Sequence, residues 1–165
     1  RMSIKHEIEP VYDKNSRILI LGSFPSVKSR EAGFFYGHPQ NRFWKVLSTV
    51  LNQPLPTSID EKKEFILNNK IALWDVIASC EIKGSSDSSI KNVVPNNINE
   101  ILNNSKVKTI FTNGKLAFNL YNKYIFEKTN IAAISLPSTS PANAAFSLDR
   151  LCDEWKIISK HLKSQ

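Results

Sequence analysis

The stretch Arg17-Ile18-Leu19-Ile20-Leu21-Gly22 decides the fold class. It is a continuous aliphatic run that ends at a glycine, which is typical of a strand buried on both faces of a sheet. Three further runs are also β-branched or aliphatic and also end at a turn or cap residue. They are Ile71 to Trp74, Val107 to Thr112 and Ile131 to Leu136.

The segments between these runs have helical spacing. One apolar stripe follows Asn41, a second follows Asn113 and Gly114, and a third lies near the end of the chain. The stripes are Phe43, Val46, Leu47, Val50 and Leu51; Leu116, Ala117, Leu120, Tyr121 and Tyr124; and Leu148, Leu151, Cys152, Trp155, Ile158 and Leu162. Alternating strands and helices predict an α/β fold with a mostly parallel sheet, whose ligands bind beyond the carboxyl ends of the strands. The Ser/Asn-rich stretch from Lys83 to Asn97 predicts a mobile surface loop.

Composition limits the class of protein. The chain has 165 residues, 41% of them hydrophobic, and no apolar run long enough to cross a bilayer. Arg1 precedes Met2, so we expect Arg1 to be a cloning remnant and residues 2–165 to form one cytoplasmic domain. Cys80 and Cys152 lack metal-ligand spacing, so we predict buried thiols and neither metal nor cofactor. The net charge of +7 favours a polyanionic partner such as nucleic acid.

The segment between the first predicted strand and the first predicted helix is rich in aromatic residues. It contains Gly22-Ser23-Phe24-Pro25-Ser26 and Phe34-Phe35-Tyr36-Gly37-His38-Pro39-Gln40-Asn41-Arg42-Phe43-Trp44. Exposing so many large apolar groups in a connecting loop is unfavourable. Either a planar ligand stacks here, or the rings fill a small core under the loop.

Asn41 and His38 each have two interpretations. Asn41 directly precedes a predicted helix and can be its N-cap, with the amide oxygen accepting a backbone N–H. Alternatively, the amide faces the strand ends and holds a water molecule by donating and accepting at once. One side chain cannot serve both roles fully. His38 is either a general acid or base, because histidine titrates near neutrality, or a hydrogen-bonded structural residue of the loop.

Polar residues also follow the other predicted strands. Ser138, Thr139 and Ser140 lie between two prolines in a stiff loop that either contacts phosphate oxygens or forms a turn and helix cap. Asn113 precedes a glycine, which favours a tight turn after the third strand. Asp75, after the second strand, is either a cap or a polar anchor. The functional residues are therefore expected at these strand ends.

In combination, these segments resemble the uracil-DNA glycosylase superfamily, and in particular its hypoxanthine-DNA glycosylase branch. The similarity extends in order over almost the whole chain. It includes Gly22 to Ser26, Phe35 to Trp44, Leu73 to Val76, Phe111 to Gly114 and Leu136 to Pro141, of which the second is the most specific. The neighbouring mismatch-specific uracil glycosylases have Asn where this chain has Ser23, and that difference argues against efficient uracil removal.

The resemblance implies a three-layer α/β sandwich, with a four-stranded, largely parallel sheet flanked by helices. It implies a monomeric base excision repair enzyme that hydrolyses the bond between deoxyribose and a flipped deaminated base, hypoxanthine first of all, in double-stranded DNA. No metal or other cofactor is implied, and Asn41 has the catalytic role. The implied base-binding residues are Gly22, Ser23, Phe24, Phe35, Tyr36 and Asn113, and the implied DNA-binding residues are Ser26, His38, Ser138, Thr139 and Ser140.

Three other functions remain open on the residues alone. Uracil or xanthine could be the main substrate in mismatched DNA. A non-catalytic nucleic-acid-binding module would show salt-sensitive binding without release of a base. A serine hydrolase is disfavoured, because Gly22 to Ser26 lacks the nucleophile-elbow pattern and no acid–histidine pair is evident in the sequence.

Overall fold

The computed structural model describes residues 2–163 and contains a four-stranded parallel sheet. Its strands are β2 (Ile18–Gly22), β3 (Ile71–Asp75), β6 (Thr109–Asn113) and β7 (Ile134–Leu136). They lie in the order β3-β2-β6-β7, and every neighbouring pair is parallel. All residues of β2 and β3 are buried, because both faces of the sheet are covered. The predicted α/β class is confirmed.

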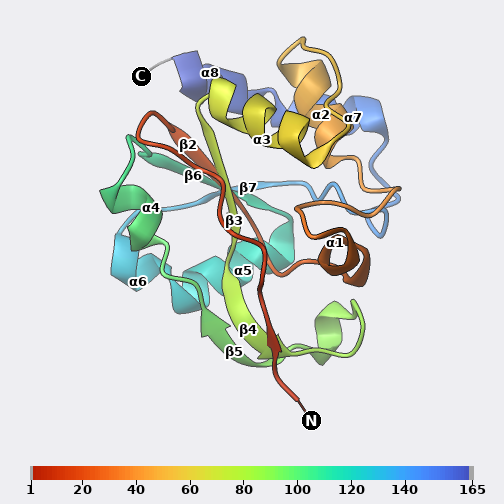
Figure 1. Cartoon of the computed structure of the whole chain (residues 1–165), viewed down its shortest axis with the longest axis vertical. Helices are drawn as coiled ribbons and strands as arrows, with labels where there is room; N and C mark the ends of the chain where they lie inside the picture. The colour runs from red at the N-terminus through yellow and green to blue at the C-terminus, as the bar shows by residue number, and fades with distance from the viewer. Residues whose placement is uncertain (1, 164–165) are drawn as a thin grey trace.

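Helices cover both faces of this sheet (Figure 1). One face is covered by α2 (Phe43–Val50), α3 (Ile59–Asn68), α7 (Leu148–Trp155) and α8 (Ile157–Lys163). The other is covered by α4 (Asn99–Asn103), α5 (Lys115–Tyr124) and α6 (Phe126–Thr129). The three-layer arrangement is therefore as predicted. The last helix was predicted as one, but it is interrupted at Lys156 and forms α7 and α8.

Serine caps set the start of three helices. Ser58 and Glu61 form a capping box at α3, in which each side chain accepts from the other residue's backbone N–H. Ser147 caps α7, and Ser26 caps α1 (Val27–Ala32). Neither α1 nor α3 was predicted, because each buries only one or two of its residues and so lacks a clear apolar stripe.

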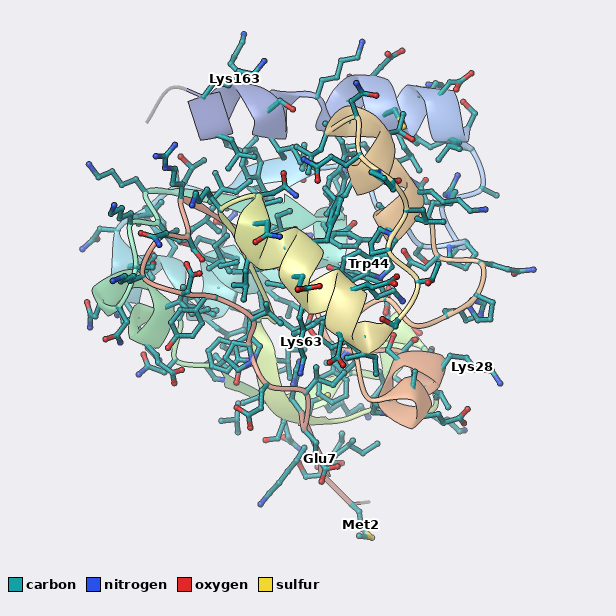
Figure 2. All side chains as sticks on the ribbon, turned by 45° about the horizontal axis from the view of Figure 1, so that its top comes forward. Met2, Glu7, Lys28, Trp44, Lys63 and Lys163 are labelled. Atoms are coloured by element: carbon teal, nitrogen blue, oxygen red, sulfur yellow. The ribbon has the colours of Figure 1, made fainter. Side chains whose placement is uncertain are left out.

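A second, antiparallel sheet was also not predicted. It has the order β1-β4-β5, with β1 (Ile4–Lys5), β4 (Ile77–Glu81) and β5 (Lys91–Pro95). The predicted loop over residues 83–97 is wrong at β5, a strand with no fully buried residue and hence no apolar signal. Met2, before β1, and Glu7, after it, lie at the opposite end of the molecule from Lys163 (Figure 2).

The two cysteines are free and buried, as predicted, and burial raises the pKa of both thiols. Among residues 2–163, no group of three or more His, Cys, Asp or Glu side chains converges on a point that could hold a metal ion. The helices in this part of the chain are too short or too polar to span a membrane.

Candidate functional site

The carboxyl ends of the parallel strands border a pocket of about 750 Å³. The strand register places Gly22 beside Asp75 and Asn113 beside Leu136 at this edge of the sheet. The volume lies within the range of small-ligand sites. Of the predicted site residues, all but His38 line this pocket: Gly22, Ser23, Phe24, Ser26, Phe35, Tyr36, Asn41, Asn113, Ser138, Thr139 and Ser140.

The carboxamide of Asn41 is held in one orientation. Its Oδ1 accepts a hydrogen bond from the Phe43 N–H at 2.9 Å and another from the Thr139 hydroxyl at 2.8 Å. Those two bonds occupy both lone pairs of the oxygen. Within residues 2–163, no acceptor pairs with Asn41 Nδ2, so this group can donate to a ligand in the pocket that Asn41 lines.

Neither interpretation of Asn41 holds as predicted, and the N-cap assignment is wrong by one residue. Arg42 is the N-cap residue of α2, and Asn41 lies one position earlier, where its oxygen accepts the Phe43 N–H at the helix start. The amide oxygen therefore supports the helix, and the NH₂ group remains for the pocket. The expectation that Asn41 holds a water by donating and accepting at once is contradicted, because its oxygen has no free lone pair.

Thr139 connects Asn41 to Asn113. Its hydroxyl accepts from Asn113 Nδ2 at 3.0 Å, and its backbone N–H donates to Asn113 Oδ1 at 3.0 Å. The single hydroxyl hydrogen of Thr139 is donated to Asn41 Oδ1, so the hydrogen bonds run in one direction, from Asn113 through Thr139 to Asn41. Thr139 is only 1% exposed, and both of its donors are used inside the protein. These contacts contradict the expected contact between Thr139 and DNA phosphate and instead give the residue a supporting role.

The Arg42 side chain holds the loop that contains the predicted DNA-binding serines. Its guanidinium donates to the carbonyls of Ser140 and Asn143 at 3.0 Å each, and also to the Phe146 carbonyl. Ser138 Oγ accepts from the Ser140 N–H at 3.1 Å, so the loop has the turn geometry that was one of the alternatives. Both serines are half-buried at the pocket, and their contact with DNA stays a prediction.

Most of the aromatic block forms a packed core beneath the pocket. Phe35 is 2% exposed and packs against Phe34, with ring centroids 5.4 Å apart. Tyr36 stacks on Phe43 at 4.0 Å, which covers one face of the tyrosine ring. The small-core interpretation therefore holds for Phe34 and Phe35. Little of the Phe35 ring is accessible, so a base has little surface there on which to stack. Phe24 is half-buried and offers more.

Asp75 and His6 form a buried pair at the pocket. His6 Nε2 lies 2.7 Å from Asp75 Oδ2, and the two side chains are 1% and 5% exposed. The pair was not evident in the sequence, because its partners are 69 residues apart and His6 follows a strand that was not predicted. His6 Nδ1 is buried and has no hydrogen-bond partner in the part of the chain that the structure describes. Within residues 2–163 no serine bonds to His6, so the pair is not part of a serine hydrolase triad.

The Tyr36 hydroxyl and Asp75 lie together beside Gly22. A Cβ on Gly22 would approach Asp75 Oδ1 to 2.4 Å and the Tyr36 hydroxyl to 2.9 Å, so this position requires glycine. Burial, together with the Asp75 carboxylate, raises the pKa of Tyr36 above its ordinary value, although the Asn113 side chain opposes the rise. Among the described residues 2–163, none forms a hydrogen bond of good geometry with this buried hydroxyl. Tyr36 therefore stays protonated and keeps its hydrogen to donate.

His38 and Ser26 both have structural contacts. His38 does not line the pocket, and its Nδ1 accepts the Gln40 N–H at 3.0 Å. This bond supports the interpretation of His38 as a structural loop residue. Ser26 lines the pocket and also caps α1 by accepting the Ser29 N–H at 3.1 Å. Contacts between these two residues and DNA stay predictions.

Comparison with known proteins gives consistent results. The model of the Uracil DNA glycosylase superfamily matches residues 9–162. A hypoxanthine DNA glycosylase from Methanosarcina acetivorans is 33% identical over 162 residues, covering 96% of this chain and 99% of that protein. One from Methanosarcina barkeri is 34% identical over 113 residues, covering 67% of this chain and 72% of that protein.

A solved structure also matches the fold over almost its full length. It is a solution NMR structure of a candidate uracil DNA glycosylase from Methanosarcina acetivorans, with a TM-score of 0.81 and 32% identity. The match covers 98% of this chain and 99% of the other. Sequence and fold therefore agree with the resemblance seen in the motifs. The chain belongs to the uracil DNA glycosylase superfamily.

Proposed function

We propose that this protein is a monofunctional DNA glycosylase that removes deaminated bases, hypoxanthine foremost, from double-stranded DNA. The observation that carries the proposal is the fixed Asn41 amide, whose free N–H donors belong to a residue lining a pocket large enough to admit a purine. Support also comes from two relatives that are named hypoxanthine DNA glycosylases. Ser23, in place of an asparagine, makes uracil the weaker substrate.

The substrate reaches the pocket by leaving the duplex. A stacked base cannot enter a pocket at the strand ends, so the nucleotide rotates out at a cost of about a few kcal/mol. A mispaired hypoxanthine is easier to extract than a well-paired base. The net charge of +7 assists the approach to DNA, because phosphate contacts release counterions. Ser26, Ser138 and Ser140 are proposed to contact the flanking backbone.

The chemistry is an N-glycosidic hydrolysis. The bond between the sugar C1′ and the base nitrogen breaks, the electron pair leaves with the base, and the sugar acquires oxocarbenium character. Asn41 Nδ2 donates to the departing purine, and a donor already fixed in place stabilises the developing negative charge. Water then bonds to C1′ and loses a proton to solvent. Asn41 does not take that proton, because its oxygen is occupied.

The substrate assignment is tested with duplexes that contain a single inosine, uracil or xanthine. After incubation and alkali, we expect the inosine strand to be cleaved fastest. Faster cleavage at uracil or xanthine would transfer the assignment to that base. Salt-sensitive binding without alkali-labile sites in any duplex would support the non-catalytic module instead.

Replacing Thr139 with valine keeps the side-chain shape and removes the hydroxyl. We expect excision of hypoxanthine in single turnover to fall about tenfold, because Asn41 loses one of the two bonds that orient it. The matched Thr139→Ser variant keeps the hydroxyl and should stay close to the parent. A folded Thr139→Val variant with the parent's rate would show that this support is not needed.

A further inference from the structure

Basic side chains gather at the edge of the main sheet that lies opposite the pocket. This edge is formed by the amino ends of the parallel strands, where the Arg17 N–H donates to the Lys70 carbonyl at 2.7 Å. On the other side of β2, the Lys106 N–H donates to the Ser16 carbonyl at 3.0 Å. The Lys108 N–H donates to the Arg17 carbonyl at 3.3 Å. Four basic residues from three segments of the chain therefore lie side by side.

The end of α8 extends this group. Arg17 Nη1 donates to the Leu162 carbonyl at 3.3 Å, which brings Lys163 next to the start of β2. Lys160 lies three residues before Lys163, on the same side of the helix. Figure 2 shows Lys163 on the opposite side of the molecule from Lys28 of α1. We call these six residues the basic edge: Arg17, Lys70, Lys106, Lys108, Lys160 and Lys163.

The basic edge contains most of the net charge of the protein. The chain has 22 Lys and Arg and 15 Asp and Glu residues, which give the net charge of +7. Outside the basic edge, 16 basic and 15 acidic residues almost balance. The adjacent turn has one residue of each sign, Asp13 and Lys14. Among the described residues, the charged side chains that line the pocket are Asp75, Asp87 and Lys115, so the excess positive charge lies elsewhere.

The fold does not neutralise the charge of the basic edge. Within residues 2–163, no carboxylate pairs with any of its lysines. Lys70 has a φ of 62°, in the left-handed region that favours glycine or asparagine, so local geometry does not account for a lysine there. Like charges held together destabilise the folded state unless an anion binds to them. The remaining four lysines are exposed to such an anion: Lys106, Lys108, Lys160 and Lys163.

The chemistry of the basic edge favours nucleic acid over a protein partner. Protein interfaces are depleted of lysine and depend on aromatic or apolar anchors. Val107 is buried, so Lys106 and Lys108 project without an exposed apolar residue between them. Mobile lysine charges without such an anchor suit a phosphate backbone.

We infer that the basic edge is a second nucleic-acid-binding surface, which contacts the phosphate backbone of one DNA segment while the pocket faces another. Phosphate contacts carry no sequence information, so this surface binds any duplex. One protein molecule then holds two segments at once and transfers between them without release into solution. The inference goes beyond the proposed function, because it concerns a surface that takes no part in excision.

The test is a bridging assay with two short undamaged duplexes, one attached to beads and the other fluorescent. The parent should retain the fluorescent duplex on the beads, and retention should weaken steeply as the salt concentration rises. The triple variant Lys70→Gly, Lys106→Gln and Lys108→Gln removes three charges, and glycine suits the backbone at position 70. We expect its retention of the fluorescent duplex to fall at least about tenfold. Single-turnover excision from a short inosine duplex, at saturating protein, should keep the parent's rate.

A control variant removes the same charge elsewhere. Lys5→Gln, Lys123→Gln and Lys128→Gln change three exposed lysines outside the basic edge, and this variant should bridge like the parent. If the triple variant does not fold, the exposed pair Lys106→Gln and Lys108→Gln should still lower retention about fivefold. Absence of bridging by the parent, unchanged bridging by a folded variant of the basic edge, or an equal loss in the control would overturn the second surface. Bridging by a parent that releases no hypoxanthine would instead overturn the proposed function.

Discussion

Replacing Asn41 with alanine is expected to lower single-turnover excision of hypoxanthine by about 100- to 1,000-fold, the loss typical for removal of one preorganised donor. The amide NH₂ has no acceptor within residues 2–163, whereas the oxygen is fully used. Affinity for undamaged DNA should change little, since phosphate contacts dominate it. The measurement pairs rapid-quench excision assays with DNA binding at matched salt.

Asn41→Asp distinguishes two possible roles of residue 41, donation of a hydrogen bond to the departing base and acceptance of a proton from water. The alanine variant removes both and cannot distinguish them. One carboxylate oxygen can still accept from the Phe43 N–H and the Thr139 hydroxyl, so the local geometry is kept. The other oxygen replaces the donor and brings negative charge toward a departing anion. We therefore expect Asn41→Asp to be at least as impaired as Asn41→Ala. An aspartate variant that is clearly faster than the alanine variant would indicate that residue 41 accepts a proton from water.

Trp155→Ala is expected to lower the free energy of unfolding by about 3–5 kcal/mol. The indole is fully buried, packs edge to face on Phe43 at 5.9 Å, and donates from Nε1 to the Pro137 carbonyl at 2.9 Å. It therefore joins α7, the start of α2 and the loop after β7. Urea unfolding followed by circular dichroism measures the loss.

Trp155→Phe is the matched control for this substitution. It keeps an aromatic ring against Phe43 but removes the donor to Pro137. We expect a smaller loss of about 1–2 kcal/mol, mostly from the unpaired carbonyl. Equal unfolding midpoints for the alanine variant and the parent would contradict the central packing role of Trp155.

The main sheet was predictable, whereas the smaller sheet was not. Runs such as Ile18–Gly22 are apolar throughout because both faces are covered, and no helical pattern explains so short a run. β5 shows no such signal, since none of its residues is fully buried, and β1 has only two residues. Their pairing with β4 depends on tertiary contacts rather than on local sequence.

The membership of the pocket was more predictable than its chemistry. Asn41 lies just before the start of α2 and Asn113 at the end of β6, and both belong to sequence motifs. The α/β fold brings ligand-binding residues together at such positions. The orientation of the Asn41 amide depends on Thr139, 98 residues away, and no local pattern encodes that bond. Asp75 could be interpreted only as a cap or anchor, because its partner His6 lies 69 residues away in the sequence.

The most direct measurement of the central claim is chromatography with mass detection of what the parent protein releases from a duplex containing one inosine. We expect free hypoxanthine, in an amount equal to the alkali-labile sites formed, while the strand remains unbroken until alkali is added. Release of deoxyinosine or its nucleotide, or a strand break without free base, would contradict hydrolysis of the N-glycosidic bond.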